Sequence, residues 1–246
     1  MWNALLWGAV SGSAVLIGAL AALFLRIQTR WIGFIMAFGT GVLIGAAAYE
    51  LLDDSANDGG LVPTIIGFIA GALVFTGFDW YISRKGGSGR KRSVRSGKSA
   101  QPHSGSGLAI FAGTVLDAIP ESIMIGASLI SGEGVSLLLV IAIFISNIPE
   151  GLSSTAGLKQ DGYSKSKIIL LWLSVLVIST VASGAGYAFM DHANGSTTAL
   201  IASFAGGGII AMVSSSMMPE AYEEGGPLTG LAAALGLLCS LILDHL

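Results

Sequence analysis

Long apolar stretches separated by short polar joints dominate the 246-residue chain. An α-helix needs roughly 20 mostly apolar residues to cross the hydrocarbon core of a bilayer. Eight stretches approach or exceed that length, so the pattern predicts an all-α, polytopic membrane protein with eight transmembrane helices. The expected spans are residues 4–25, 31–53, 61–83, 107–130, 135–156, 167–190, 197–220 and 228–245.

The composition agrees with this interpretation. Hydrophobic residues make up 53% of the chain and charged residues 11%, against about 25% charged residues in an ordinary soluble domain. Eight spans of roughly 20 residues leave little chain for a soluble module. We therefore expect a single transmembrane domain over residues 1–246 and no enzymatic module. No basic residue precedes the first apolar stretch, so we expect no cleaved signal peptide.

The basic residues lie on one side of the predicted bundle. All twelve fall in the joints after the first, third and fifth spans, and the positive-inside rule places those joints in the cytoplasm. Both termini are then extracellular, and residues 84–106 form a long, basic, flexible cytoplasmic loop between spans three and four. The opposite joints carry acids and no Lys or Arg; they either concentrate cations or are merely polar. The basic residues are Arg26, Arg30, Arg84, Lys85, Arg90, Lys91, Arg92, Arg95, Lys98, Lys159, Lys165 and Lys167.

Three acidic residues, Asp117, Glu121 and Glu150, lie inside predicted spans. A charged side chain at the centre of a single helix costs at least about 2.5–3.5 kcal/mol. Because every Lys and Arg lies in a joint, internal salt bridges are not available. The acids must therefore take up protons or bind metal ions.

The spacing of polar residues favours one shared site. Asp117 and Glu121 lie four residues apart on one helical face, as do Ser146 and Glu150, while Asn147 is three residues from Glu150. If spans four and five pack together, these oxygen atoms converge.

Two prolines strengthen this expectation. Pro120 and Pro149 lack N–H groups, so the carbonyls of Leu116 and Ile145 lose their usual helical donors. A cation or water in a protein-lined cavity can satisfy such carbonyls. The sequence therefore predicts an oxygen-rich cation site near the membrane midplane. The alternative is that the prolines only kink the helices and the acids stay protonated in hydrogen bonds.

Two segments carry a repeated motif, Asp-Ala-Ile-Pro-Glu-Ser at 117–122 and Ser-Asn-Ile-Pro-Glu-Gly at 146–151. They resemble the His-Asn-x-Pro-Glu-Gly pattern on the fourth and fifth helices of the ZIP family of divalent-metal transporters, in particular its bacterial and archaeal branch. The segments 37–45 and 218–221 are similar to parts of the family's second and seventh helices. The resemblance covers nearly the whole chain.

The resemblance implies uptake of a divalent metal ion into the cytoplasm across the plasma (inner) membrane, with zinc as the first candidate. The expected partners are the metal ion, the lipid bilayer and, from relatives, a second copy in a homodimer; no nucleic acid and no prosthetic group are expected. Carried over residue by residue, the metal site comprises Asp117, Glu121, Ser146, Asn147 and Glu150.

The motif departs from the family at three positions. Asp117 replaces the first His, Ala118 replaces an Asn and cannot ligate, and Ser146 stands where His or Gln is common. His103, His192 and His245 lie in joints or at the C-terminus, so the expected site is all-oxygen. Such ligands favour harder ions, which makes Mn²⁺ or Fe²⁺ plausible cargo beside Zn²⁺. One or two metal positions both remain open.

Other functions fit part of the pattern. A proton-coupled carrier of another solute would use Glu121 and Glu150 as proton relays, and a metal-binding membrane sensor would bind without transport. An intramembrane hydrolase needs a nucleophile and base or an open zinc site, and no such motif lies within a span.

Secondary features flank the predicted site. An entrance for the ion is one interpretation of three acids at the outer face, Glu50, Asp53 and Asp54. An exit is the matching interpretation of three acids near the inner end of span seven, Glu220, Glu223 and Glu224. The alternative is that both groups are simply solvated helix ends. The pairs Gly41/Gly45 and Gly67/Gly71 have the Gly-x-x-x-Gly spacing and serve either helix contacts or dimerisation.

Overall fold

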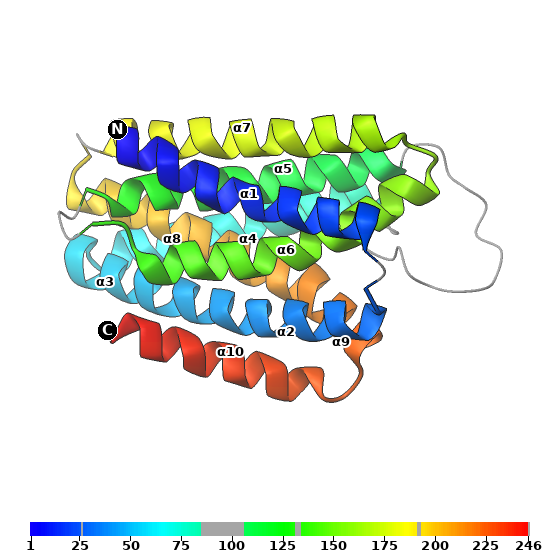
Figure 1. Cartoon of the computed structure of the whole chain (residues 1–246). Coiled ribbons are helices and arrows are strands. Elements are labelled where there is room, and N and C mark those ends of the chain that lie inside the picture. The colour runs from blue at the N-terminus through cyan, green and yellow to red at the C-terminus, as the bar shows by residue number, and fades with distance from the viewer. Residues whose placement is uncertain (26, 85–105, 131–133, 191–192, 246) are drawn as a thin grey trace.

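The computed structural model describes residues 1–25, 27–84, 106–130, 134–190 and 193–245 (Figure 1), and every regular element in these ranges is helical. The predicted loop 84–106 therefore lies largely outside the described residues, as do His103 and His192. The elements are α1 Trp2–Phe24, α2 Thr29–Ala46, the π-helix η1 Ala47–Asp53, α3 Asp54–Gly59, α4 Leu61–Arg84, α5 Ser106–Ser128, α6 Leu137–Gln160, α7 Lys165–Met190, α8 Gly195–Met212, the π-helix η3 Val213–Met217, α9 Met218–Gly225 and α10 Thr229–Asp244.

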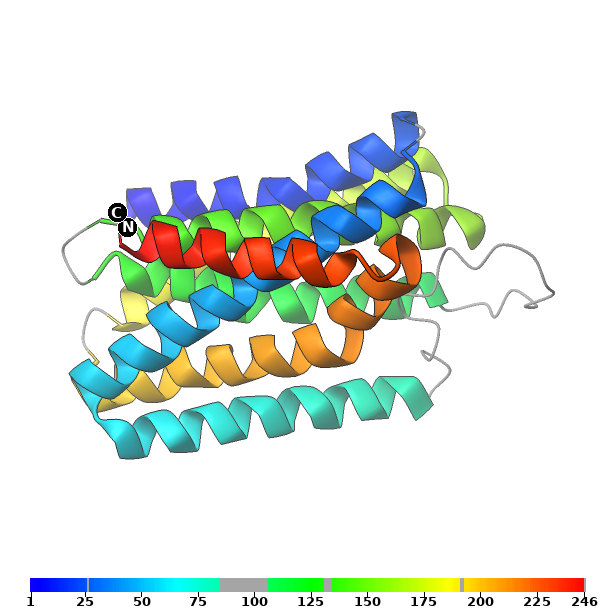
Figure 2. The same cartoon turned by 90° about the horizontal axis from the view of Figure 1, so that it is seen from below.

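The helices have the length and composition of membrane spans. Six continuous helical runs among the described residues are long and apolar enough to cross a bilayer, and α10 is a shorter apolar helix. The predicted span four corresponds to α5, a helix of 23 residues that contains Pro120. An all-helical, multi-pass membrane architecture is thus confirmed, while the number eight stays a prediction. Met1 and His245 lie at the same end of the bundle, called here the terminal end (Figures 1 and 2), as an even number of passes requires.

Two runs extend beyond the predicted spans. The predicted spans 31–53 and 197–220 belong to continuous helices that end at Gly59 and Gly225. Each run passes through a π-helical segment into a short α-helix and stops before a glycine with positive φ, Gly60 at 95° and Gly226 at 75°. Glycine adopts this left-handed conformation without the steric cost that a Cβ brings. The acidic residues near these ends do not stop the helix; the glycines do.

The helix α6 lies at the centre of the bundle. In its apolar 18-residue stretch, 72% is buried inside the protein, whereas the corresponding share for α4 is 17%. It packs along α1 and α2 and also contacts α5, while α5 packs along α7. Figure 1 shows α6 running between α1 and α2. Residues on α6 are therefore surrounded by protein, whereas α4 presents most of its surface outward.

The helix pairs repeat. The contact of α1 with α6 has a counterpart in α7 with α5, that of α2 with α10 in α8 with α4, and that of α2 with α9 in α8 with α3. Exchanging α1 with α7, α2 with α8, α3 with α9, α4 with α10 and α5 with α6 maps these three contacts onto one another, whereas the extensive contact of α2 with α6 has only a slight counterpart in α8 with α5. Such internal repeats are common in secondary transporters.

The predicted glycine motifs pack within the chain. A Cβ added at Gly41 would overlap the carbonyl oxygen of Ala233 on α10, and one at Gly71 would overlap that of Phe204 on α8. Small residues let membrane helices approach closely. Of the two alternatives, helix contact within one chain accounts for these glycines.

Candidate functional site

All five predicted metal-site residues lie inside the protein. Asp117, Glu121, Ser146, Asn147 and Glu150 are each 5% exposed or less. The apolar side chains of α4 and α10, in contrast, supply many of the exposed hydrophobic residues. The motif carboxylates therefore face other helices and not the lipid, which is the arrangement that a cation site in a bundle requires.

A hydrogen bond joins the two motif helices. The hydroxyl Oγ1 of Thr114 on α5 donates to Oε1 of Glu150 on α6 at 3.1 Å, and Thr114 is itself buried. This bond brings α5 and α6 into contact at Glu150. Thr114 was not predicted as a site residue. Its one sequence signal is its position three residues before Asp117 on the same helical face.

Glycines bring α1 and α2 close to the α6 motif. An added Cβ at Gly39 of α2 would lie 3.0 Å from Cα of Ser146, and one at Gly18 of α1 would overlap the carbonyl oxygen of Ile148. In the same interface, a Cβ added at Gly151 of α6 would overlap the carbonyl oxygen of Val15 on α1. The backbone around Pro149 is therefore enclosed by two neighbouring helices.

The carboxylates are not gathered into a compact acidic cage. Within the part of the chain that the structure describes, no group of three or more His, Cys, Asp and Glu side chains is arranged to hold a metal ion. Ser146 and Asn147 supply further oxygen atoms in the same buried region, and the Ser146 hydroxyl donates to the carbonyl of Ile143 at 3.0 Å. An ion bound here would combine carboxylates with neutral oxygen donors.

Two further glutamates accept hydrogen bonds from serines of α6, one at its N-cap and one about two turns before its last residue. At the terminal end, the hydroxyl of Ser136, which caps α6 by accepting from the N–H of Leu139 at 3.0 Å, donates to Glu50 of η1. Toward the other end, the buried hydroxyl of Ser153 donates to buried Glu220, which follows η3 closely. Because an α-helix rises about 1.5 Å per residue, the two serines lie roughly 25 Å apart along α6. Between them lie the polar motif residues 146–150 and, nearer the terminal end, the wholly apolar stretch 137–145.

The buried Ser179 of α7 lies against α1. An added Cβ at Gly12 would be 2.9 Å from its Cβ. We therefore do not include Ser179 among the site residues.

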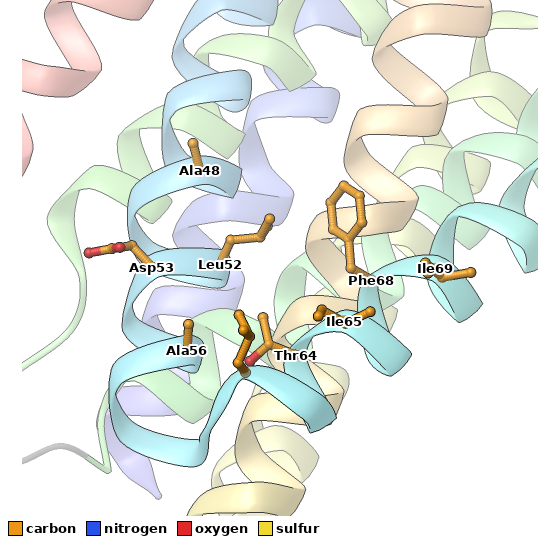
Figure 3. Close-up of a pocket in the computed structure, with 9 residues that line it drawn as sticks. Ala48, Leu52, Asp53, Ala56, Thr64, Ile65, Phe68 and Ile69 are labelled. Carbon is orange, nitrogen blue, oxygen red and sulfur yellow. The ribbon is translucent and has the colours of Figure 1, made fainter.

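A separate pocket of about 420 Å³ opens between η1, α3 and α4 (Figure 3). Leu52, Ile65 and Phe68 contribute to its mostly apolar lining, with Asp53 at its edge. None of the five predicted metal-site residues lines it. The Asp53 carboxylate instead accepts a hydrogen bond from Asn57 at 3.2 Å.

The chain is similar to several curated proteins. It is 28% identical to zinc transporter SLC39A7 of Canis lupus familiaris over 174 residues, 65% of this chain and 37% of that protein. It is 25% identical to "Putative zinc transporter At3g08650" of Arabidopsis thaliana over 223 residues, 89% of this chain and 34% of that protein. Zinc transporter zipt-7.2 of Caenorhabditis elegans is 32% identical over 111 residues, 42% of this chain and 23% of that protein.

These relatives are named as zinc transporters. The chain spans about a third of the length of the first two of them. No family model matches the chain.

Proposed function

We propose that this protein is a ZIP-type transporter that carries a divalent metal ion across a membrane through the interior of its helix bundle. The observation that carries the proposal is the burial of Asp117, Glu121 and Glu150 within a bundle of long apolar helices. The similarity to zinc transporters makes Zn²⁺ the first cargo to test.

Electrostatics supports a cation as the occupant. Burying a carboxylate in a low-dielectric interior is unfavourable unless a proton, an opposite charge or a metal ion neutralises it. The sequence holds no Lys or Arg in the middle of any apolar stretch. A dication among these carboxylates would offset their mutual repulsion and their desolvation together.

The donor chemistry extends the choice of metal. Asp117, Glu121, Ser146, Asn147 and Glu150 offer oxygen ligands only. Carboxylate and carbonyl ligands suit Mn²⁺ and other hard ions, whereas imidazole suits Zn²⁺ and Fe²⁺. Mn²⁺ therefore belongs beside Zn²⁺ in the assay, and Fe²⁺ follows as a borderline case.

The proposed path follows α6. The ion enters near Glu50 at the terminal end, reaches the carboxylates of α5 and α6, and leaves near Glu220. The positive-inside rule puts the terminal end outside the cell, so transport runs into the cytoplasm. A membrane potential of 100 mV contributes about 2.3 kcal/mol per charge moved inward. The repeated helix pairs support exposure of the site to each side in turn by motion of one group of helices against another.

In this proposal the protein lies in the plasma membrane of the cell. A homodimer is supported by the resemblance to the family alone.

The test is ion flux into liposomes that contain the purified protein. Zn²⁺, Mn²⁺, Fe²⁺ and Mg²⁺ are offered at fixed pH and again across a pH gradient. We expect saturable flux of at least one transition metal, lost in Glu121→Gln and Glu150→Gln. Asp58→Asn is the matched control because Asp58 is an exposed carboxylate on α3. Wild-type flux in both glutamate variants would refute the site.

The same vesicles separate the alternatives. A proton-coupled carrier of another solute would respond to the pH gradient but not to competing metals. A sensor would bind metal and show no flux.

A further inference from the structure

We infer that Thr114 is a positioning residue that holds the Glu150 carboxylate in place for the transported cation. The inference rests on the proposed function, because it assigns Glu150 to the ion. Thr114 belongs to α5 and Glu150 to α6, 36 residues away in the sequence. The fold, and not the geometry of a single helix, therefore brings Thr114 beside Glu150.

The contact is buried and directional. Thr114 is 2% exposed and Glu150 is 5% exposed, and their oxygen atoms are 3.1 Å apart. A hydroxyl has one proton to donate, and here it points across the helix interface toward a carboxylate. In Thr180 of α7, by comparison, the hydroxyl donates to the carbonyl of Leu176 in its own helix at 2.8 Å. Thr114 therefore links two helices in a way that Thr180 does not.

The register of α5 places Thr114 beside the other carboxylates. Thr114, Asp117 and Glu121 are spaced by three and four residues, so they lie along one face of α5. The hydroxyl of Thr114 thus fixes the position of the α6 carboxylate relative to the face that presents Asp117. One oxygen of Glu150 is held, and the orientation of the carboxylate plane is restricted for ligation.

A group that orients a metal ligand contributes measurably to the affinity of the site for the metal ion. Removing such a partner typically lowers metal affinity 10- to 100-fold. A threonine that only filled space would instead tolerate valine, which has nearly the same shape but no hydroxyl.

The experiment compares Thr114→Val, Thr114→Ser and Thr180→Val in the full-length protein. Thermal unfolding in detergent, the dissociation constants of Zn²⁺ and Mn²⁺, and the concentration dependence of flux in liposomes are measured for each. We expect Thr114→Val to raise the dissociation constant and the half-saturating concentration 10- to 100-fold, with a smaller change in maximal rate. Thr114→Ser, which keeps the hydroxyl, should restore affinity, and Thr180→Val should bind as the wild type does.

A double variant tests whether Thr114 acts through Glu150. In the Glu150→Ala background the comparison is made by thermal unfolding, because metal binding is already lost there. Thr114→Val should lower the melting temperature less in this background than in the wild type, since the acceptor of its hydrogen bond is gone. If Thr114→Val unfolds, Thr114→Ala carries the same comparison.

The outcomes separate the two claims. Wild-type metal affinity in Thr114→Val, together with loss of binding in Glu150→Gln, would overturn the positioning role and leave the proposed function intact. Equal loss in Thr114→Val and Thr114→Ser would also overturn it. Wild-type binding and flux in Glu150→Gln would instead refute the proposed function.

Discussion

The approach of α1 to α6 makes the size of residue 151 a sensitive test of the bundle. Gly151 follows Glu150 directly, and a Cβ at this position would lie within 3.0 Å of the Val15 carbonyl carbon and still closer to its oxygen. Both atoms belong to the backbone of α1, so they cannot rotate away. Gly151→Ala therefore forces α6 and α1 apart beside the predicted metal site.

The magnitude follows from two opposing contributions. In a helix interior, alanine is favoured over glycine by about 1 kcal/mol, whereas overpacking of a tight interface costs typically 1–3 kcal/mol. The difference is a loss of roughly 0–2 kcal/mol in the free energy of unfolding, and we expect the upper part of this range because the added Cβ would overlap backbone atoms of α1. For a domain of this size, 1 kcal/mol shifts the melting temperature by roughly 2–4 °C.

The matched control is Gly208→Ala on α8, because a Cβ at Gly208 meets nothing within 4 Å. This variant should gain the helix preference of about 1 kcal/mol without a clash. Melting temperatures in the same detergent should therefore move in opposite directions for the two variants. A Gly151→Ala protein as stable as the Gly208→Ala protein would show that α1 and α6 do not pack as described.

Further substitutions test other contacts. Ser153→Ala removes the hydroxyl that donates to the buried Glu220 carboxylate, so we expect the free energy of unfolding to fall by about 1–3 kcal/mol in a thermal unfolding experiment. Ser174→Ala is the control and should lower it less, because the Ser174 hydroxyl bonds to the carbonyl of Leu171 in its own helix. Ser146→His introduces an imidazole among the oxygen donors and should shift the preference from Mn²⁺ toward Zn²⁺, measured by competition in flux; an unchanged selectivity would contradict an ion position beside residue 146. Glu150→Gln should abolish metal flux while the protein still folds, and full flux would count against the site.

Hydrophobic patterning was sufficient to predict the helical architecture, because a bilayer dictates both the length and the composition of a span. It also placed the helices within a few residues. The ends of the second and seventh spans were less predictable, since acidic residues suggested a stop. Gly60 and Gly226, with positive φ, end these helices instead.

The contact of α5 with α6 was a condition of the predicted site and not a prediction, and the structure shows this contact and buries the five polar residues. Their service as metal ligands remains a prediction. The role of Thr114 could not be predicted from the sequence, because a threonine in an apolar helix usually bonds to a backbone carbonyl of its own helix. Only the three-dimensional contact reveals that its hydroxyl reaches Glu150. The bond between Ser153 and Glu220 spans 67 residues, a separation at which no local pattern is informative.

The hydrogen bonds at the start of α6 and about two turns before its end limit how this helix can move. Ser136 is the N-cap of α6 and Ser153 lies within it, with Pro149 between them, and their acceptors, Glu50 and Glu220, belong to two different chain segments. A piston-like slide of α6 alone would stretch both attachments at once. A displacement of α6 along its axis would therefore either move η1 and α9 with it or break one of these two hydrogen bonds, which couples its motion to both segments.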